Sequence, residues 1–269
     1  MTAVWDGELY AANTAHHRRF DDHVLAGLAP PPDGTVLDLG CGAGDLTRRL
    51  VGLVPRGRVL GVDADPSMVR VAAAAGGGPE YAVARAQDLR GAVPDASVDL
   101  VVSTAALHWV PADEQALVLA EVARVLRPGG TFRAELGGAG QIAAARAVLD
   151  EVSREHGGGA GPWCFPSPQE YAPLLAAAGL GTDGGWLRLV HQRRSMPDAD
   201  ALVGWLRSQV LIAYEPALEP ASRASFRAEA ERRALAALRR DDGTYDQDYV
   251  RLDLLARRAG EQEALRSRG

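Results

Sequence analysis

Three glycines near residue 40 have the type and spacing to hold a ligand against the backbone. An apolar run at 36–39 leads into Gly40, Gly42 and Gly44, and helical spacing resumes at 45–50. Because glycine lacks a side chain, a ligand can approach the backbone closely at such a strand-to-helix corner. The G-x-G-x-G spacing differs from the G-x-G-x-x-G of dinucleotide sites, so the pattern disfavours a nicotinamide-dependent oxidoreductase.

Three acidic residues at predicted strand ends indicate what this corner binds. Asp38 precedes the first glycine by two positions, where a carboxylate suits an ammonium group better than a phosphate. Asp63 follows Gly40 by 23 residues at the end of the second predicted strand, which is the spacing of an acid that binds a ribose diol. Asp88 follows the third predicted strand, where its carboxylate can accept a hydrogen bond from the exocyclic amine of adenine.

Two more residues extend this prediction on the adenine side. Leu89 can offer its backbone N–H to the base, and Met68 lies in a helix predicted to start at Asp65 and Pro66, placed to lean over the adenine face. Recognition of an ammonium group, a ribose and an adenine together predicts S-adenosylmethionine as the cofactor. Ser103, at the end of the fourth predicted strand, can offer its carbonyl to the ammonium group or can simply end the strand.

These motifs make the chain similar to the class I S-adenosylmethionine-dependent methyltransferases. Four segments resemble, in order, the glycine motif, the ribose-binding segment, the fourth strand and the turn before the fifth strand of that family: residues 36–44, 61–68, 99–103 and 124–130. Other residues resemble the trans-aconitate methyltransferase-like branch of the family: Trp5, Asp6, Tyr10, 107–110, Glu135, Gly137, Gly138 and 163–168. The chain departs from that branch at Gln141, where Asn is expected, and at Thr14, where relatives often carry His.

The resemblance implies that the chain binds S-adenosylmethionine and releases S-adenosylhomocysteine. It places Ala64 with Asp63 in the ribose-binding segment. Trp5 and Tyr10 precede the first strand. For these two residues the resemblance favours an N-terminal helix that closes over the cofactor, and the alternative is a helix that only anchors to the sheet.

Five residues are candidates for the acceptor side of the site. His108 and Trp109 follow the fourth predicted strand, where side chains can face the reacting methyl group, although such a pair can also serve packing and capping. Trp163, Trp205 and Gln209 fall in loop and helical segments expected above the pocket, with core packing as the alternative. The remaining histidines show no metal-ligand spacing, so no metal site is predicted.

The order of the predicted elements indicates an α/β fold. Strands that alternate with helices predict a parallel sheet, and they lie near 35–39, 58–62, 80–84, 98–103 and 130–136. The resemblance implies a Rossmann-like class I methyltransferase sheet flanked by helices, parallel except for one antiparallel strand. Strands near 186–191 and 249–255 would complete that sheet. Between them, two amphipathic helices near 199–214 and 219–240 predict a helical lid insertion.

We expect one methyltransferase domain over residues 1–269, divided into four parts. These parts are an N-terminal lid helix at 1–30, a cofactor-binding core at 31–136, the sheet completion at 137–198 and 249–260, and the helical lid insertion at 199–248.

Composition and charge narrow the partners that we expect. The net charge of −6 argues against a broad nucleic-acid surface, and Ser103 to Ala106 lack the Asn/Asp-Pro-Pro-aromatic pattern of enzymes that methylate bases. No run approaches the roughly 18 apolar residues of a membrane span. The two cysteines, Cys41 and Cys164, have neither metal nor disulfide spacing. We therefore predict a cytoplasmic protein with a small-molecule substrate and no nucleic-acid or membrane partner.

The predicted function is methyl transfer from S-adenosylmethionine to a small molecule, with a carboxylate or a secondary metabolite as candidate acceptors. A carboxylate would need no base and could be tethered by the indole N–H of Trp109, whereas a hydroxyl or carbon acceptor would need a base such as His108. The alternative is a protein that binds the cofactor without methyl transfer, as a rearrangement catalyst or a binding module. The sequence fixes neither the acceptor nor the oligomeric state.

Overall fold

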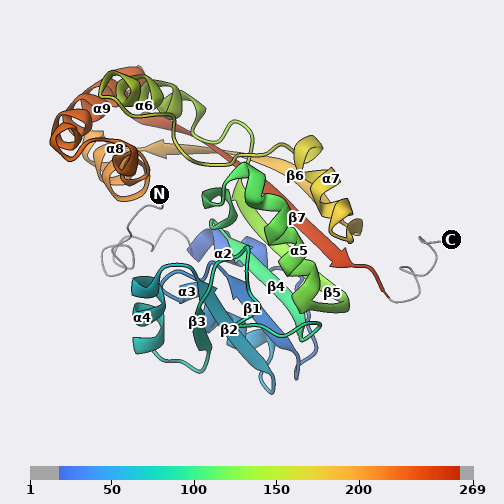
Figure 1. The fold of residues 1–269 in the computed structure, drawn as a ribbon. Coiled ribbons are helices and arrows are strands. Elements are labelled where there is room, and N and C mark those ends of the chain that lie inside the picture. The colour runs from blue at the N-terminus through green and yellow to red at the C-terminus, as the bar shows by residue number, and fades with distance from the viewer. Residues whose placement is uncertain (1–17, 261–269) are drawn as a thin grey trace.

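The computed structural model describes residues 18–260, and within them the chain forms a seven-stranded sheet flanked by helices (Figure 1). The strand order is β3-β2-β1-β4-β5-β7-β6, and the bounds are β1 (Thr35–Leu39), β2 (Arg58–Asp63), β3 (Glu80–Val83), β4 (Val98–Thr104), β5 (Leu126–Gly137), β6 (Leu180–Met196) and β7 (Tyr245–Arg258). The strands β1 to β5 pair in parallel, and β7 is antiparallel to both β5 and β6. The predicted fold class is confirmed.

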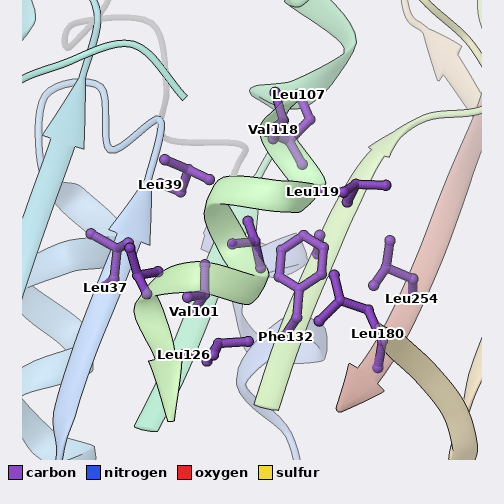
Figure 2. Packing of buried hydrophobic residues seen from close by; sticks show 14 of the residues in the cluster. Leu37, Leu39, Val101, Leu107, Val118, Leu119, Leu126, Phe132, Leu180 and Leu254 are labelled. Atoms are coloured by element: carbon purple, nitrogen blue, oxygen red, sulfur yellow. The ribbon is translucent and has the colours of Figure 1, made fainter. Parts of the chain in front are cut away.

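Apolar side chains cover both faces of the sheet, as expected for parallel strands buried between helices. On one face, α5 (Gln115–Val125) and α7 (Pro168–Ala177) enclose the larger core, in which Leu37, Val101 and Phe132 are fully buried (Figure 2). On the other face, α2 (Arg18–Leu25) and α3 (Asp45–Leu50) cover a smaller core around Val36, Leu100 and Val102. Alternate residues of one strand therefore serve different cores.

Local signals set the helix that follows β2. The side chain of Asp65 accepts hydrogen bonds from the backbone N–H groups of Ser67 at 2.7 Å and of Met68 at 3.4 Å, and Pro66 occupies the first turn of α4 (Pro66–Ala74). This is the N-cap arrangement that the sequence predicts. The fixed φ angle of Pro66 also favours the start of the helix.

A separate group of helices lies beyond one end of the sheet, and we call it the helical cap (Figure 1). It contains α6 (Ala143–Glu155), α8 (Ala199–Trp205) and α9 (Arg223–Ala237), and it has its own buried core, with Leu149, Leu206 and Phe226 among its members. The antiparallel strands β6 and β7 run past the sheet into this group (Figure 1). They are longer than predicted because they carry the cap as well as completing the sheet.

Two features of the cap differ from the sequence prediction. The helix expected at 199–214 divides into α8, a π-helical turn at Leu206–Val210 and a 3-10 turn at Leu211–Ala213. The helix α6 packs against α9 in the cap, although the predicted subdivision grouped it with the sheet completion. The amphipathic pattern shows that such helices bury one face, but not which partner they bury it against.

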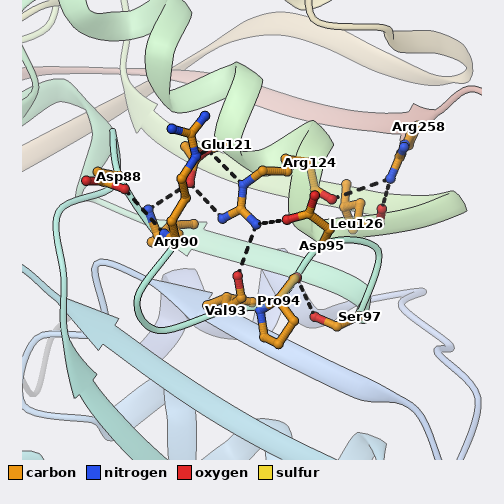
Figure 3. A network of polar contacts seen from close by, with 11 residues as sticks. Asp88, Arg90, Val93, Pro94, Asp95, Ser97, Glu121, Arg124, Leu126 and Arg258 are labelled. Atoms are coloured by element: carbon orange, nitrogen blue, oxygen red, sulfur yellow. Dashed lines mark hydrogen bonds and ion pairs between the residues drawn. The ribbon is translucent and has the colours of Figure 1, made fainter.

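A buried acid ties the connection after β3 to α5. Glu121 accepts hydrogen bonds from Arg124 at 2.7 and 2.8 Å and from the backbone N–H of Leu89 at 2.7 Å. Figure 3 shows Glu121 between Arg124 and Arg90. The hydrogen bonds from Arg124 hold the pKa of Glu121 below its usual range, against the opposing effect of burial.

We predict that Glu121→Gln lowers the free energy of unfolding at pH 7 by about 1.5–3 kcal/mol, because it weakens charge-assisted hydrogen bonds in a buried place. An unfolded glutamate has a pKa of about 4.3. The pKa of Glu121 in the folded protein is lower than this. The stabilisation is therefore complete above the unfolded pKa, and it is lost as the pH falls through the folded pKa. Urea unfolding should show the difference between wild type and variant shrinking between pH 7 and about pH 3. An equal difference at both values would contradict the prediction.

Candidate active site

The three glycines form a left-handed corner where β1 passes into α3. Gly40, Gly42 and Gly44 have φ values of 78°, 52° and 82°. A Cβ on Gly40 would lie 2.2 Å from the Cβ of Ala106, so a side chain does not fit there. The backbone N–H of Gly40 donates to Val62 at 2.7 Å, which fastens the corner to the end of β2. The corner is thus a rigid cradle of bare backbone.

The predicted ribose acid lies against this cradle. The carboxylate of Asp63 accepts the backbone N–H of Gly42 at 2.9 Å on one oxygen and that of Asp65 at 2.9 Å on the other. Burial raises the pKa of Asp63, and these N–H groups oppose that effect. Ala64 lies next to it and is exposed. An acid held in this way at a strand end can still accept hydroxyl donors on its remaining lone pairs.

Asp38 lies beneath the glycine corner. Its side chain is only 1% exposed and accepts a hydrogen bond from the hydroxyl of Thr47 at 2.6 Å. Its predicted contact with an ammonium group stays a prediction. Cys41 is buried beside it, and burial followed by the charges of Asp38 and Asp63 raises the pKa of its thiol. The thiol therefore stays protonated, in line with a packing role.

The adenine side of the prediction needs one correction. Met68 is buried in α4, and Asp88 is exposed with its carboxylate accepting the N–H of Arg90 at 3.3 Å. Leu89 is fully buried, and its backbone N–H donates to Glu121. That N–H is therefore not offered to a base, and the predicted contact of Leu89 is wrong in this structure. The competing acceptor lies 32 residues away in the sequence, beyond the range of local patterns.

Three other predicted cofactor residues can be placed only in part or not at all. Ser103 is 1% exposed and its hydroxyl donates to the carbonyl of Leu39 at 2.7 Å, joining β4 to the end of β1. Its carbonyl contact with the cofactor stays a prediction. Trp5 and Tyr10 lie outside the described residues, so their predicted role as a lid stays a prediction too.

A cavity that is open to solvent lies between the carboxyl end of β4 and the helical cap. Its lining comes from the sheet, the connecting loops and the cap: Ala105, His108, Trp109, Gln141, Ile142, Trp163, Phe165, Arg194, Trp205, Gln209, Val210, Gln247, Tyr249 and Arg251. The structure brings together all five residues predicted for the acceptor side, namely His108, Trp109, Trp163, Trp205 and Gln209. We call this cavity the acceptor pocket.

One wall of the acceptor pocket is aromatic. Trp163 stacks on Phe165 with ring centroids 5.8 Å apart and an interplanar angle of 8°, and Trp109 meets Trp163 edge-on at 5.6 Å. The ring centroid of His108 lies 5.8 Å from the ring centroids of both Trp109 and Phe165. Such contacts hold rings in fixed orientations, so this wall is preorganised.

Unusual backbone geometry shapes the same pocket. The π-helical turn at Leu206–Val210 follows Trp205 and contributes Gln209 to the lining. Two non-glycine residues of the lining, Ala105 and Ile142, have φ values of 54° and 49°. π-helical turns and left-handed non-glycine residues both occur preferentially at functional sites.

A second group of lining residues, which we call the basic wall, is rich in guanidinium and amide groups, and sequence reasoning missed most of it. Gln247, Tyr249 and Arg251 alternate along β7 and therefore point to one face, and Arg194 pairs with Gln247 across β6. The guanidinium of Arg194 lies 4.9 Å from the Tyr249 ring centroid, a cation–π contact. The i, i+2, i+4 spacing was the available signal, but the predicted strand began at residue 249 and so excluded Gln247.

A backbone hydrogen bond orients the ring of His108. The backbone N–H of Gly137 donates to its Nδ1 at 3.2 Å. Because Nδ1 accepts this hydrogen bond, the proton of the neutral ring lies on Nε2. The carbonyl of His108 in turn accepts the N–H of Cys164 at 2.9 Å, which joins this segment to the aromatic wall.

Comparisons with known proteins agree with this geometry. A family model described as a methyltransferase domain matches residues 37–134. The trans-aconitate 2-methyltransferase of Azoarcus sp. (strain BH72) is 33% identical over 223 residues, which cover 80% of this chain and 83% of that protein. The same enzyme of Mycobacterium tuberculosis (strain ATCC 25177 / H37Ra) is 30% identical over 239 residues, covering 84% and 85%. The solved YcgJ protein of Bacillus subtilis has a TM-score of 0.62 at 17% identity, covers 91% of this chain and 99% of its own, and shares the fold.

The strand order, the glycine corner and Asp63 define a class I methyltransferase that uses S-adenosylmethionine. Within that class, the chain belongs to the trans-aconitate methyltransferase-like branch. The cradle and Asp63 fit the cofactor, because the bare backbone accommodates its amino-acid end and the acid offers acceptors for hydroxyl groups. Among the described residues, no helix is long and apolar enough to span a membrane, and no cluster of side chains suits a metal ion.

We predict that Gly40→Ala weakens binding of S-adenosylhomocysteine and costs about 1–3 kcal/mol of stability, because a Cβ would clash with Ala106 at a positive φ. Gly52→Ala is the matched control, since a Cβ there meets no heavy atom within 4 Å. Calorimetry should show weaker binding only for Gly40→Ala. Unchanged affinity in that variant would remove the glycine corner from the cofactor site.

Proposed function

We propose that this enzyme transfers the methyl group of S-adenosylmethionine to a carboxylate oxygen of a small organic acid. The observation that carries the proposal is the hydrogen bond from the Gly137 N–H to Nδ1 of His108. It fixes the proton of the neutral ring on Nε2, so that nitrogen is a donor and has no lone pair with which to remove a proton. A donor suits an anionic acceptor, whereas a hydroxyl or carbon acceptor would need a base.

The lining of the acceptor pocket supports an anionic acceptor. Arg194 and Arg251 contribute positive charge, and Gln141, Gln209 and Gln247 contribute amides. None of the described lining residues is Asp or Glu. A carboxylate in such a place gains charge-assisted hydrogen bonds and meets no like charge. It is also ionised at neutral pH, so its oxygen is ready to react without proton removal.

The residues of the chain then act by holding and shielding the acceptor. The cofactor, when bound, supplies a methyl group already activated by the sulfonium. The glycine corner and Asp63 hold the cofactor at the carboxyl ends of β1 and β2, and the basic wall holds the acid. The aromatic wall and the cap restrict water around the reacting atoms. Correct placement of two reactants can contribute about 7–11 kcal/mol to the lowering of the barrier.

Trans-aconitate is the first acceptor to test, because two relatives that share most of their length with this chain are named trans-aconitate 2-methyltransferases. Conversion would give a mass gain of about 14 daltons for each methyl added, and a carboxyl ester would be hydrolysed by mild alkali, unlike a methyl ether or a C-methyl product. This readout identifies the methylated atom as well as the acceptor.

His108→Gln separates the two roles of the imidazole. The amide of glutamine can replace Nε2 as a hydrogen-bond donor but cannot act as a base, so we predict a loss in kcat/KM for trans-aconitate of less than about tenfold. His108→Ala removes the donor and should lose more. A loss of about 10² to 10⁴ in His108→Gln, with unchanged affinity for S-adenosylhomocysteine, would identify His108 as a base and contradict the proposal.

A further inference from the structure

Arg251 is held from behind, on the side away from the acceptor pocket. Its Nε donates to Oε1 of Glu135 at 2.8 Å, and its Nη2 donates to the backbone carbonyl of Glu135 at 3.3 Å. Both side chains are 5% exposed. Arg251 lines the pocket and Glu135 does not. The acid therefore contacts the guanidinium on the side that faces the sheet.

The remaining edge of this guanidinium is available to the pocket. Within the described part of the chain, the hydrogen bonds of Arg251 involve Nε and Nη2, which leaves Nη1 for a ligand. The Tyr249 ring lies 5.2 Å from the guanidinium carbon and supports its plane. A guanidinium fixed on two sides presents its third side in a set direction, which is the geometry for binding a planar anion.

Gln247 gives a second and independent indication of a ligand on this wall. It is 5% exposed, it lines the acceptor pocket, and its Oε1 has no hydrogen-bond partner among the described residues. It lies on the same face of β7 as Tyr249 and Arg251. A buried amide oxygen that accepts no hydrogen bond is costly to keep, and a ligand with a hydrogen-bond donor would satisfy it.

We propose that Glu135 is a positioning residue that aims Arg251 at the acceptor, so that the guanidinium of Arg251 holds a carboxylate group of the acid. The proposal rests on the proposed function, since it concerns the same pocket and the same class of acceptor. Glu135 touches neither the acceptor nor the cofactor. It acts by fixing the guanidinium and by balancing a buried positive charge.

The backbone of Glu135 extends this role to the other side of the pocket. Its carbonyl accepts the N–H of Ala105 at 2.8 Å as well as the Nη2 of Arg251. Ala105 lines the pocket with a left-handed backbone. One residue thus sets the position of Arg251 relative to the loop that leads to His108.

The first experiment is steady-state kinetics of Glu135→Gln with trans-aconitate at saturating S-adenosylmethionine. Because the substitution removes the charge behind Arg251, KM for trans-aconitate should rise about tenfold, with kcat within about twofold of wild type. Glu121→Gln is the matched control, because it is the same isosteric change of a buried acid in another Glu–Arg pair outside the pocket (Figure 3). Its KM should equal that of wild type. Unchanged KM in Glu135→Gln, or an equal rise in both variants, would overturn the proposal.

A double-mutant cycle separates positioning from a structural role. Arg251→Gln should raise KM at least as much as Glu135→Gln, and the double variant should show the KM of Arg251→Gln alone, because Glu135 acts through Arg251. If the fold-increase in KM of the double variant equals the product of the two single increases, Glu135 acts independently of Arg251 and the proposal is overturned. Affinity for S-adenosylhomocysteine should stay at the wild-type value in every variant. If Glu135→Gln fails to fold, Glu135→Asp is the second variant. It keeps the negative charge, but its shorter side chain moves the carboxylate away from the position that holds the guanidinium of Arg251, so KM should again rise.

Binding of trans-aconitate, measured by calorimetry with S-adenosylhomocysteine present, distinguishes this proposal from the proposed function. If wild type methylates the acid and only the positioning effect is absent, this inference fails and the function stands. If wild type binds the acid without methylating it and Glu135→Gln weakens that binding about tenfold, the inference stands and the function fails. If wild type neither binds nor methylates trans-aconitate, both are wrong for this acid.

Discussion

The antiparallel pairing of β7 with both β5 and β6 is the constraint on which the acceptor side depends. Its register places Arg251 opposite Gly137 and Asp253 opposite Glu135, so the polar residues of β7 lie beside the end of β5. The same strand continues past the sheet and pairs Gln247 with Arg194 in the extension that carries the cap. A shift of one residue would turn Arg251, Tyr249 and Gln247 to the other face of the sheet.

Gly137 shows how closely this pairing is fitted to the rest of the pocket. A Cβ at that position would lie 2.5 Å from the Phe165 ring, so only glycine lets the aromatic wall approach the sheet. The same residue donates its N–H to His108 and thereby sets the tautomer of the imidazole. The backbone of the sheet, rather than a flexible loop, therefore orients the imidazole of His108.

Local patterns predicted the glycine corner and the helix start that follows β2. The glycine spacing, Asp63 and the Asp65–Pro66 helix start each act over a few residues, and the structure places them as expected. Leu89 failed because Glu121, on a helix far along the chain, takes its N–H. Gln247 and Arg251 were missed for a related reason. Both lie on one face of β7, and Arg251 is also held by Glu135 of β5. Neither fact is encoded in neighbouring residues.

The acceptor pocket also shows what this fold gives up in stability. A buried Glu135–Arg251 pair contributes little net stability compared with well-packed apolar residues, because both charges are desolvated. Gln247 adds a buried amide oxygen without a partner, and Ile142 adds a β-branched residue in a left-handed conformation. These costs fall within one pocket, whereas the sheet core beneath it is packed with apolar side chains. Selection for stability alone does not explain why these unfavourable features occur together in one pocket. Binding of a ligand that offsets their cost explains it best.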